Sequence, residues 1–529
     1  MGSLYVQAGT GWGPVITEDE FLLYRANIGG FDAAIVASVE FRSAPADVEI
    51  VLKYLADTVA AIVDGTIQTW SAGPPPSIRL TFDAVGAGRL FVSSASVGGR
   101  ERSFAHRVML VVDEPGELTR SQVAEMLAAV GRLPFSHLER CEMGEQMPLT
   151  ACLPDHLPAG ALKEVAPVLT VHHMTDFLVL VDAIARLGVP PAAMTVLDKG
   201  YRYTHRDRVD AHLRQLGIAV WPWTEAADGL ADHVSRADRS GRSCILVDDG
   251  GYTLPVLMDA RPDLVPSFSG LVEQTMSGIY KLERFGDGLP VPVFSVAESR
   301  LKGTIESYGI ADAAVRNVLR LLPHEKFEGQ PALVVGFGRI GEQVAELLRA
   351  RRMRVAVFDR RLASLIAAHE RGFLTARSLP RLLDYHRPML VFGCTGRVSL
   401  HGEHALALRR DCFLVSTTSR DYEFALDEIA EESRRVTDAG MLGMRFELRH
   451  GVTATVVADG YPVNFHHAES LPNKYADLIL ASLVMGAVTL ARPDHGFRPG
   501  HNVEATDRVL ESCGLLERYY SRFGPEGLR

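Results

Sequence analysis

The chain lacks the features that mark several protein classes. Its 529 residues include six cysteines without CxxC spacing, so no disulfide framework is expected and reduced thiols are the default. Lys and Arg residues are scattered along the chain and form no patch with aromatic residues. Acidic residues outnumber them, which gives a net charge of −10, so nucleic acid is not expected as a partner. His401 and His404 lie three apart with no third ligand in view, so no metal site is expected.

Signals for export and membrane insertion are also missing. The first residues, MGSLYVQAG, lack the basic and apolar regions of a signal peptide, and Val6 stands where a myristoylation motif requires Ser or Thr. The longest apolar run begins at Tyr475, is short of a spanning length and contains Asp477, which favours a buried core helix. We therefore expect a cytoplasmic protein with no membrane partner.

Length and hydrophobic periodicity indicate several domains. Apolar residues make up 47% of the chain and charged residues 23%, as in ordinary globular proteins. The strand and helix patterns of residues 1–145 predict an α+β domain without a chemical motif, which we interpret as a module for oligomerisation or for binding a protein partner. From about residue 165, short apolar strands alternate with helices, and a second such set begins at Ala332. The fold class is therefore predicted to be α/β, with two doubly wound, Rossmann-like parallel sheets plus the N-terminal α+β domain.

A glycine motif follows the first strand of the second set. Gly336, Gly338 and Gly341 lie between this strand and a helical pattern, and Asp359 ends the next strand. The first glycine permits a tight turn, the second lets backbone N–H groups approach a pyrophosphate, and the third lets the helix pack on the strand. Asp359 can accept hydrogen bonds from the ribose hydroxyls of NAD, while Arg360–Arg361 keep NADP as an alternative.

Several sequence blocks occur in an order that resembles the S-adenosylhomocysteine hydrolase family, over roughly residues 167–491. The blocks are HMT at 173–175, DDGG at 248–251, GLVEQTMSG at 270–278, VAESRLKGTIES around Lys302, GFGRIG at 336–341, CTGR at 394–397 and ADGYPVN ending at Asn464. The resemblance implies a substrate-binding α/β domain at 146–310, completed by about 470–529, around an NAD-binding domain at 311–468. It also implies a homo-oligomer acting on a small nucleoside-type molecule.

The family uses NAD as a resident catalyst. It oxidises the ribose 3′-hydroxyl, eliminates the 5′ thiol, adds water and reduces the ketone again. By resemblance, the catalytic residues are Lys302, which handles the 3′-hydroxyl proton, Glu306, where the family has an aspartate, and His173 and Asp249, the acid/base pair beside the 5′ position.

The resemblance also assigns binding residues. Substrate contacts fall to Thr175, Gln274, Phe177, His466 and His467. Cofactor contacts fall to Gly336, Phe337, Gly338, Arg339, Ile340, Gly341, Asp359, Thr395, Gly396, Asn464, Thr275 and Ser277. Taken without the resemblance, the four-residue spacing of Lys302 and Glu306 predicts an ordinary ion pair on one helix face.

The chain departs from the family at several of these positions. Ser419 stands where the family has a second active-site histidine, and Gln274 replaces a ribose-binding glutamate. Phe177 replaces the glutamate that reads the adenine amino group, and a phenyl ring cannot accept that hydrogen bond. Ala297 replaces an asparagine of the catalytic helix. His466 and His467 are open to three interpretations, as substitutes for the missing acid, as readers of another base, or as capping and loop residues.

Two functions remain open from the sequence. The first is a hydrolase-like enzyme that transiently oxidises the ribose 3′-hydroxyl of a nucleoside or nucleoside thioether, with altered recognition of base and leaving group. The alternative is a catalytically degenerate NAD-binding regulator or scaffold that uses the N-terminal domain to bind a partner. An ordinary S-adenosylhomocysteine hydrolase is disfavoured by Ser419 and Phe177.

Overall fold

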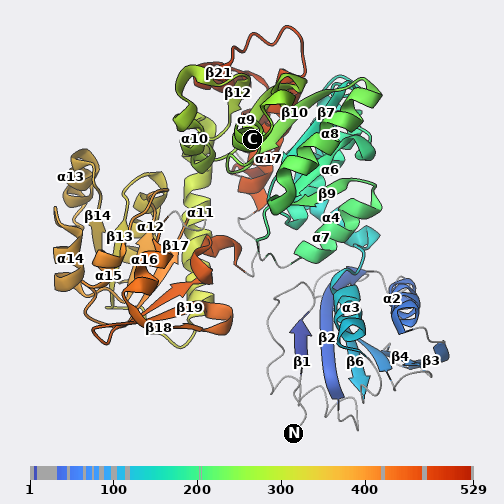
Figure 1. Ribbon diagram of the computed structural model, residues 1–529, viewed down its shortest axis with the longest axis horizontal. Coiled ribbons are helices and arrows are strands. Elements are labelled where there is room, and N and C mark those ends of the chain that lie inside the picture. Colours follow the sequence, from blue (N-terminus) through green and yellow to red (C-terminus); the bar gives the residue numbers. More distant parts are fainter. Residues whose placement is uncertain are drawn as a thin grey trace. The chain divides into compact units, whose positions relative to one another are not determined.

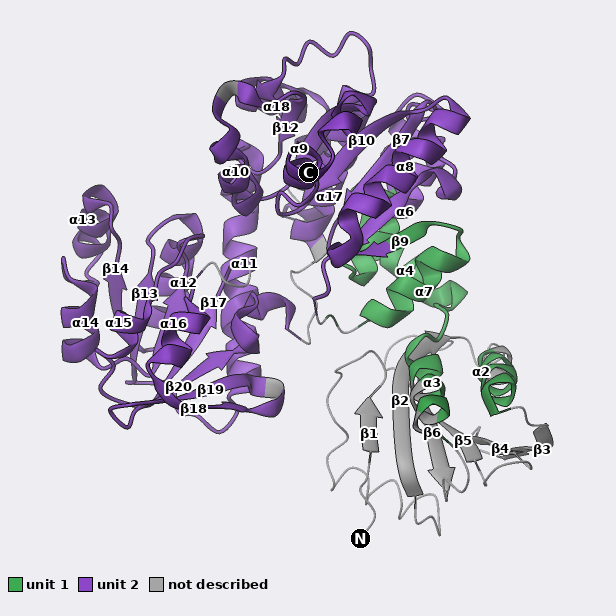
Figure 2. Cartoon of the chain, in the orientation of Figure 1, with its two compact units in different colours: residues 1–151, 173–179, 202–220 green, residues 152–172, 180–201, 221–529 purple. Residues whose placement is uncertain are grey.

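The computed structural model of the protein describes residues 5–8, 33–43, 48–63, 67–73, 77–82, 88–96, 104–113, 119–201, 203, 205–418, 423–466 and 473–525. The chain divides into two compact units (Figure 2). The first comprises residues 1–151, 173–179 and 202–220, and the second comprises residues 152–172, 180–201 and 221–529.

The first unit contains a six-stranded sheet. Its order is β1-β2-β6-β5-β4-β3, parallel between β1 and β2 and antiparallel elsewhere. The strands are β1 (Tyr5–Ala8), β2 (Ala33–Ser43), β3 (Ile67–Gly73), β4 (Ser77–Phe82), β5 (Gly88–Ser96) and β6 (Phe104–Asp113). Helices α2 (Val48–Val63) and α3 (Arg120–Gly131) pack on each other and on its strands, which confirms the predicted α+β character. The sequence patterns had not predicted β1 and β3.

The helices that follow α3 begin with strong local signals. Thr119 and Ser136 are the N-caps of α3 and of α4 (His137–Gln146), and each forms a capping box with the residue three positions on. Arg208 on α7 (Arg206–Gln215) is 1% exposed, and its guanidinium binds both carboxylate oxygens of Glu139. This buried pair joins α7 to α4 within the first unit.

The second unit contains a parallel seven-stranded sheet in the order β21-β12-β11-β10-β7-β8-β9 (Figure 1). Its strands are β7 (Val165–Thr170), β8 (Thr195–Asp198), β9 (Ala219–Pro222), β10 (Ser243–Asp248), β11 (Phe268–Glu273), β12 (Pro292–Ser295) and β21 (Gly500–His501). The chain runs outward from β7 to β8 and β9, then returns to β10 on the other side of β7. The switch point of the sheet, where ligands of such folds bind, therefore lies between β7 and β10.

The helices around this sheet follow the predicted alternation. They are α6 (Thr175–Arg186), whose residues 175–179 are counted with the first unit, α8 (Ala226–Ser240), α9 (Thr253–Ala260), α10 (Met276–Leu282), α17 (Asn473–Leu490), α18 (Val503–Ser512) and α19 (Leu515–Phe523). Helix α8 packs on β7, β8 and β10, and α17 packs on β10, β11 and β12. The chain after residue 472 thus returns to this sheet through α17 and the short edge strand β21.

Helix α17 is the predicted apolar run, and it is a core helix. Residues 476–488 are all buried, and Gly486 lets the helix approach Val272 and Phe294, where a Cβ would come within 2.9 Å of both side chains. Within the described residues, no helix combines the length and apolarity needed to cross a lipid bilayer.

A second sheet of the second unit has eight strands in the order β15-β14-β13-β16-β17-β20-β19-β18. They are β13 (Pro331–Val335), β14 (Arg354–Phe358), β15 (Leu374–Thr375), β16 (Leu390–Gly393), β17 (Cys412–Ser416), β18 (Ser433–Asp438), β19 (Gly443–Leu448) and β20 (Thr453–Val457). The first six in spatial order are parallel, and β19 and β18 add an antiparallel edge. The switch point of this sheet lies between β13 and β16.

Alternate residues of β13 enter two hydrophobic cores, because both faces of a parallel sheet are covered. Val334 belongs to the core that also includes Val315 of α11 (Arg300–Leu321) and Val344 of α12 (Arg339–Ala350). Leu333 belongs to the other core, with Leu383 of α14 (Leu379–His386). The remaining helices of this domain are α13 (Leu362–Glu370), α15 (Gly402–Ala405) and α16 (Leu426–Glu431).

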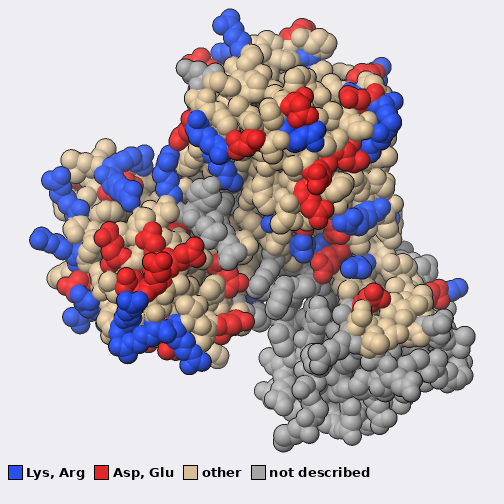
Figure 3. Space-filling model, in the orientation of Figure 1, with Lys and Arg blue, Asp and Glu red and all other residues tan. Residues whose placement is uncertain are grey.

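Charged side chains of both signs are interspersed over the described surface seen in Figure 3. None of the six cysteines, all within the described residues, forms a disulfide. Groups of three or more His, Cys, Asp or Glu side chains suited to a metal ion do not occur among the described residues.

Candidate functional site

The glycine loop after β13 has the geometry that a dinucleotide requires. Gly336 has φ +98°, and a Cβ there would lie 2.8 Å from the backbone of Cys394. A Cβ on Gly341 would lie 1.9 Å from the carbonyl oxygen of Gly336. At Gly338, the N-cap of α12, a Cβ would meet nothing within 4 Å. Space is therefore open at the helix N-terminus, where the N–H groups and the helix dipole favour a pyrophosphate.

Asp359 stands at the end of β14 beside this loop. Its side chain is 8% exposed and accepts hydrogen bonds of 2.7 Å from the backbone N–H groups of Phe337 and Arg361. The carboxylate thus joins the glycine loop to the neighbouring strand end. This is the predicted place of a ribose-binding acid.

The loop after β16 forms the other side of this switch point. Its Thr395 and Gly396 donate backbone hydrogen bonds of 2.6 and 2.7 Å to Oε1 of Glu423, which is 1% exposed. Burial raises the pKa of Glu423 to about 7. Burial also raises the pKa of the Cys394 thiol, so this thiol stays protonated.

Two predicted cofactor residues that follow the other sheet, Thr275 and Ser277, lie at the start of α10. Thr275 is the N-cap of α10, and its hydroxyl lies 3.1 Å from that of Ser277. Further along, Glu283 pairs with Arg397 at 2.9 Å, one residue beyond Gly396. The segment that follows α10 thus contacts the loop after β16 through this ion pair.

Lys302 and Glu306 form an ion pair in the first turns of α11. Lys302 Nζ lies 3.0 Å from Glu306 Oε2 and also donates to the carbonyl of Gln274. Burial raises the pKa of Glu306 against the opposing effect of the Lys302 charge. The next residue, Gly303, has no side chain, and the guanidinium of Arg339 occupies the space where its Cβ would stand. Lys302 thus lies between the seven-stranded sheet, which it contacts through the Gln274 carbonyl, and α12, whose Arg339 lies against Gly303.

Asp249 follows β10 and is 2% exposed. Its Oδ2 lies 2.9 Å from His172 Nε2 and 3.1 Å from Lys199 Nζ. Burial alone would raise the pKa of Asp249, but His172, Lys199 and Lys302 together hold it well below its usual range. His172 follows β7 and Lys199 follows β8, so three adjacent strands contribute to one cluster.

Two further buried carboxylates shape the loop after β10. Asp248 Oδ2 accepts hydrogen bonds from the N–H groups of Tyr252 and Thr253, and Glu273 accepts from those of Gly250 and Gly251. Burial raises the pKa of both carboxyls, and for Glu273 it reaches about 8. These side chains fix the backbone that presents Asp249.

Three buried polar atoms at this edge of the sheet have no hydrogen-bond partner within the described residues. They are Thr170 Oγ1 at the end of β7, Asp248 Oδ1 at the end of β10 and Gln274 Oε1 just after β11. Buried polar atoms are normally paired, and leaving one unpaired costs about 1–3 kcal/mol. Their grouping at the carboxyl ends of three adjacent strands favours a polar ligand there.

His173, Thr175 and Phe177 belong to the first unit and lie at and just before the start of α6. His173 and Phe177 are fully buried, with their rings stacked at 5.6 Å between centroids. In the second unit, Asn464 and His466 are buried, and the carbonyl of His466 accepts a 2.9 Å hydrogen bond from Asn317 of α11. His467 and Ser419 lie outside the described residues.

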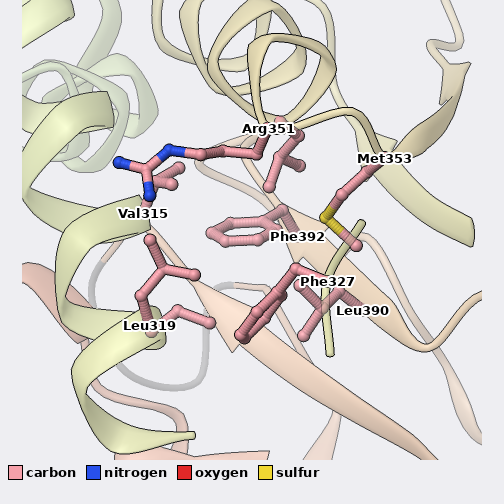
Figure 4. A pocket seen from close by; sticks show the side chains of 9 residues that line it. Val315, Leu319, Phe327, Arg351, Met353, Leu390 and Phe392 are labelled. Atoms are coloured by element: carbon pink, nitrogen blue, oxygen red, sulfur yellow. The ribbon is translucent and has the colours of Figure 1, made fainter. Parts of the chain in front are cut away.

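A small apolar pocket lies in the domain of β13 to β20 but not at its switch point. It is lined by Val315, Val318, Leu319, Phe327, Leu348, Arg351, Met353, Leu390 and Phe392. Figure 4 shows the apolar side chains of α11 and of the strand starts facing one another, with Arg351 beside them. Met353 precedes β14 and Leu390 begins β16, so this pocket is at the amino edge of the sheet, opposite the glycine loop.

Sequence reasoning did not single out His172, Lys199, Glu273 or Glu423. The signal for His172 was its place directly after a buried strand, next to a residue that had been selected. Lys199 also follows a strand end, in VLDKG. Polar residues at the carboxyl ends of parallel strands are candidates as a group, because those ends converge at one edge.

Comparison with known proteins agrees with the cofactor site. Residues 311–386 match the family described as D-isomer specific 2-hydroxyacid dehydrogenase, NAD binding domain. This match covers the second half of α11, the glycine loop and the strands up to α14. The matched segment is part of a Rossmann-like fold of the NAD-binding type, which confirms NAD as the predicted cofactor.

Three relatives extend the similarity beyond this domain. An uncharacterised protein of Mycobacterium tuberculosis is 29% identical over 344 residues, which cover 59% of this chain and 62% of that protein. The S-inosyl-L-homocysteine hydrolase of Methanopyrus kandleri is 24% identical over 364 residues, with 65% and 84% covered. The adenosylhomocysteinase of Thermoplasma acidophilum is 26% identical over 255 residues, with 47% and 60% covered. The chain thus spans less than two thirds of the mycobacterial relative. Its similarity to adenosylhomocysteinases is at low identity over about half its length.

Proposed function

We propose that the protein is an NAD-dependent enzyme that transiently oxidises the ribose 3′-hydroxyl of a nucleoside thioether and cleaves its 5′ C–S bond. The observation that carries this proposal is the placement of Lys302, whose Nζ contacts Glu306 and the Gln274 carbonyl next to the glycine-loop helix. A sugar hydroxyl fits this place because Gln274 Oε1 is a buried acceptor with no partner in the described part of the chain.

The residues divide the work of the first step. NAD, when bound at the glycine loop, supplies an acceptor for the hydride from the 3′ carbon. The hydroxyl proton passes to Lys302 in its neutral form. Glu306 can take the proton that Lys302 must first give up, because burial favours the protonated form of this carboxyl. The resulting ketone acidifies the neighbouring 4′ C–H, the 5′ sulfur leaves, water adds, and the ketone is reduced again, so the net reaction is hydrolysis.

The base is proposed to differ from adenine. Phe177, at the position that the resemblance assigns to the adenine reader, is fully buried against His173 and offers no acceptor for an amino group. The similarity to a hydrolase named for an inosyl substrate supports including a base with a carbonyl group in place of that amine.

The test is NADH absorbance of the full chain, supplied with NAD, after addition of nucleosides and their homocysteine thioethers, including the S-adenosyl and S-inosyl compounds. We expect at least one thioether to produce NADH in the wild type and none to do so in Lys302→Ala, with NAD affinity unchanged. If NAD is bound but no compound raises the NADH absorbance of the wild type, the proposed enzyme activity is contradicted. That result would favour a regulator or scaffold. The observation that supports this alternative is that Phe177, fully buried, stands where the family has a base-reading residue.

A further inference from the structure

One side of α13 exposes apolar residues to solvent. Leu362 and Ile366 are 54% and 52% exposed, and they lie one turn apart on the same side of the helix. Ala363 and Ala367 are exposed beside them, whereas Ala368, on the opposite side, is fully buried. We call Leu362, Ala363, Ile366 and Ala367 the α13 face.

The neighbouring edge strand adds a third large apolar side chain. Helix α13 contacts β15, the strand that ends the sheet on this side, and Leu374 of β15 is 39% exposed (Figure 1). Single exposed apolar residues are common on protein surfaces, but a group of them marks a surface that binds another molecule. Here three such side chains lie on two adjacent elements of one domain.

The charges at the two ends of the α13 face have opposite signs. Arg360 and Arg361 precede the helix and are exposed, and Arg361 keeps 71% of its side chain exposed although it lies 3.5 Å from Asp359. Glu370 ends the helix and is also exposed. The helix dipole has the same polarity, so the arginines stand at its positive end and Glu370 at its negative end. A carboxylate at the negative end is unfavourable by itself, and Glu370 therefore gains from a positively charged neighbour.

We propose that the α13 face is the surface through which two copies of this chain associate about a two-fold axis. In such a contact the same residues meet from both sides. With the axis beside Ile366, the two helices run antiparallel, and Leu362 of one copy lies level with Glu370 of the other, since each is four positions from Ile366.

A second copy fits this face in both charge and shape. The antiparallel arrangement brings Glu370 of each copy to the end of the other helix where the arginines and the positive end of the dipole lie. The alanines leave space between the bulkier Leu362 and Ile366, so the two helices can pack closely. A different protein would have to present the same charges in the reverse order, which a second copy supplies.

The contact is small. Helix α13 has nine residues and is about 14 Å long, so the two copies bury less than the roughly 1,600 Å² of a standard interface. We therefore expect an association that is reversible and depends on protein concentration. It is independent of the function proposed above, because neither the cofactor nor a substrate takes part in it.

Sedimentation of the full chain over a range of concentrations measures this association. We expect the dissociation constant of Ile366→Glu to be higher than that of the wild type by about tenfold or more, because the centre of an interface contributes most of its free energy. Glu370→Arg should also raise it, and more strongly at low salt, because it brings like charges together. The control is Tyr385→Glu, since Tyr385 is 78% exposed on α14 of the same domain and should leave the constant unchanged.

A disulfide tests the position of the axis. A residue beside a two-fold axis meets its own copy, so mild oxidation should link Ile366→Cys into a dimer and leave Tyr385→Cys at the level of the wild type, whose Cys141 and Cys152 are exposed. A wild type that stays monomeric would overturn the proposal, as would unchanged association of Ile366→Glu or an Ile366→Cys protein without the disulfide. Should Ile366→Glu melt well below the wild type, Leu362→Glu is read in the same way.

Discussion

Lys302 Nζ lies 3.0 Å from Glu306 Oε2, one turn further along α11, and the two side chains are 12% and 6% exposed. The same helix contains a second pair with the same spacing, Asp312 and Arg316 at 2.8 Å, whose side chains are 26% and 53% exposed. The two pairs look alike in sequence, but only the first is desolvated and touches a second segment through Gln274.

Glu306→Gln is therefore expected to slow substrate-dependent NADH formation by about 100-fold, because an amide cannot take the proton of Lys302. NAD affinity should not change. Asp312→Asn is the control, because an exposed pair of this spacing contributes only about 0.3–0.5 kcal/mol. Stopped-flow absorbance measures the rate of NADH formation in both variants. Equal rates in Glu306→Gln and the wild type would contradict a role of Glu306 in proton transfer.

The folded protein should lose stability through Glu423 as the pH rises. Burial raises the pKa of Glu423 from 4.5 to about 7, so the folded chain holds this proton more tightly than the unfolded chain. The stabilisation is complete below about pH 4.5 and disappears as the pH passes about 7. At 1.36 kcal/mol per pKa unit, the effect is at most about 3 kcal/mol.

Glu423→Gln should remove this dependence, because a glutamine oxygen can still accept from Thr395 and Gly396 without a charge. Denaturant midpoints of wild type and variant, measured from pH 5 to 8, should diverge with rising pH in favour of the variant. Glu428→Gln is the control, since Glu428 is exposed on the same domain and its pKa is lowered by the Gly402 N–H and by His401. Parallel curves for Glu423→Gln and wild type would disprove the prediction.

Most of the regular elements and the cofactor-binding motif were predictable because their causes are local. The glycine motif is readable from Gly336, Gly338 and Gly341, since each supplies a backbone property that no other residue has there. The spacing of Lys302 and Glu306 likewise fixes their contact once the segment is helical. The apolar run from Tyr475 became a core helix because Asp477 and its length suit burial in a protein.

The cluster around Asp249 was not predictable from spacing. His172, Lys199 and Asp249 meet because β7 lies between β8 and β10, an order that the sequence does not state. Glu423 was missed for a similar reason, since its partners Thr395 and Gly396 lie in another loop. Strand β3 was overlooked because IQTWSAG has a weak apolar pattern, and its pairing with β4 supplies what the pattern lacks.

The first unit should depend strongly on Arg208. Its guanidinium donates to both oxygens of Glu139 and to the carbonyls of Leu133 and Pro134, and it lies 4.1 Å from the centre of the Phe135 ring. Arg208→Ala would leave a buried carboxylate and two carbonyls without these donors, at a cost of about 3–5 kcal/mol. Calorimetry should show a lower unfolding temperature for the transition of this unit.

The control for Arg208 lies on the same helix. Arg214 pairs with Asp210 at 3.0 Å but is more than half exposed, so Arg214→Ala should change stability by less than about 1 kcal/mol. If Arg208→Ala and Arg214→Ala have similar unfolding temperatures, the buried pair contributes no more to stability than a surface pair.

Gly338 and Gly341 should respond to substitution in different ways, although they lie three residues apart in one motif. At Gly341 a Cβ would collide with the carbonyl oxygen of Gly336 at 1.9 Å, whether or not a dinucleotide is bound. Gly341→Ala must therefore push α12 away from β13 and destabilise the domain, by about 1–3 kcal/mol as in overpacked cores.

At Gly338 a Cβ would enter open space, and the backbone has φ −88°, which alanine adopts without strain. Gly338→Ala should thus fold with wild-type stability and lose NAD affinity by tenfold or more, because its methyl group fills the place of the pyrophosphate. Thermal unfolding with and without NAD, combined with an NAD titration, separates the two effects. Wild-type NAD affinity in a stable Gly338→Ala protein would place the pyrophosphate elsewhere than at the N-terminus of α12.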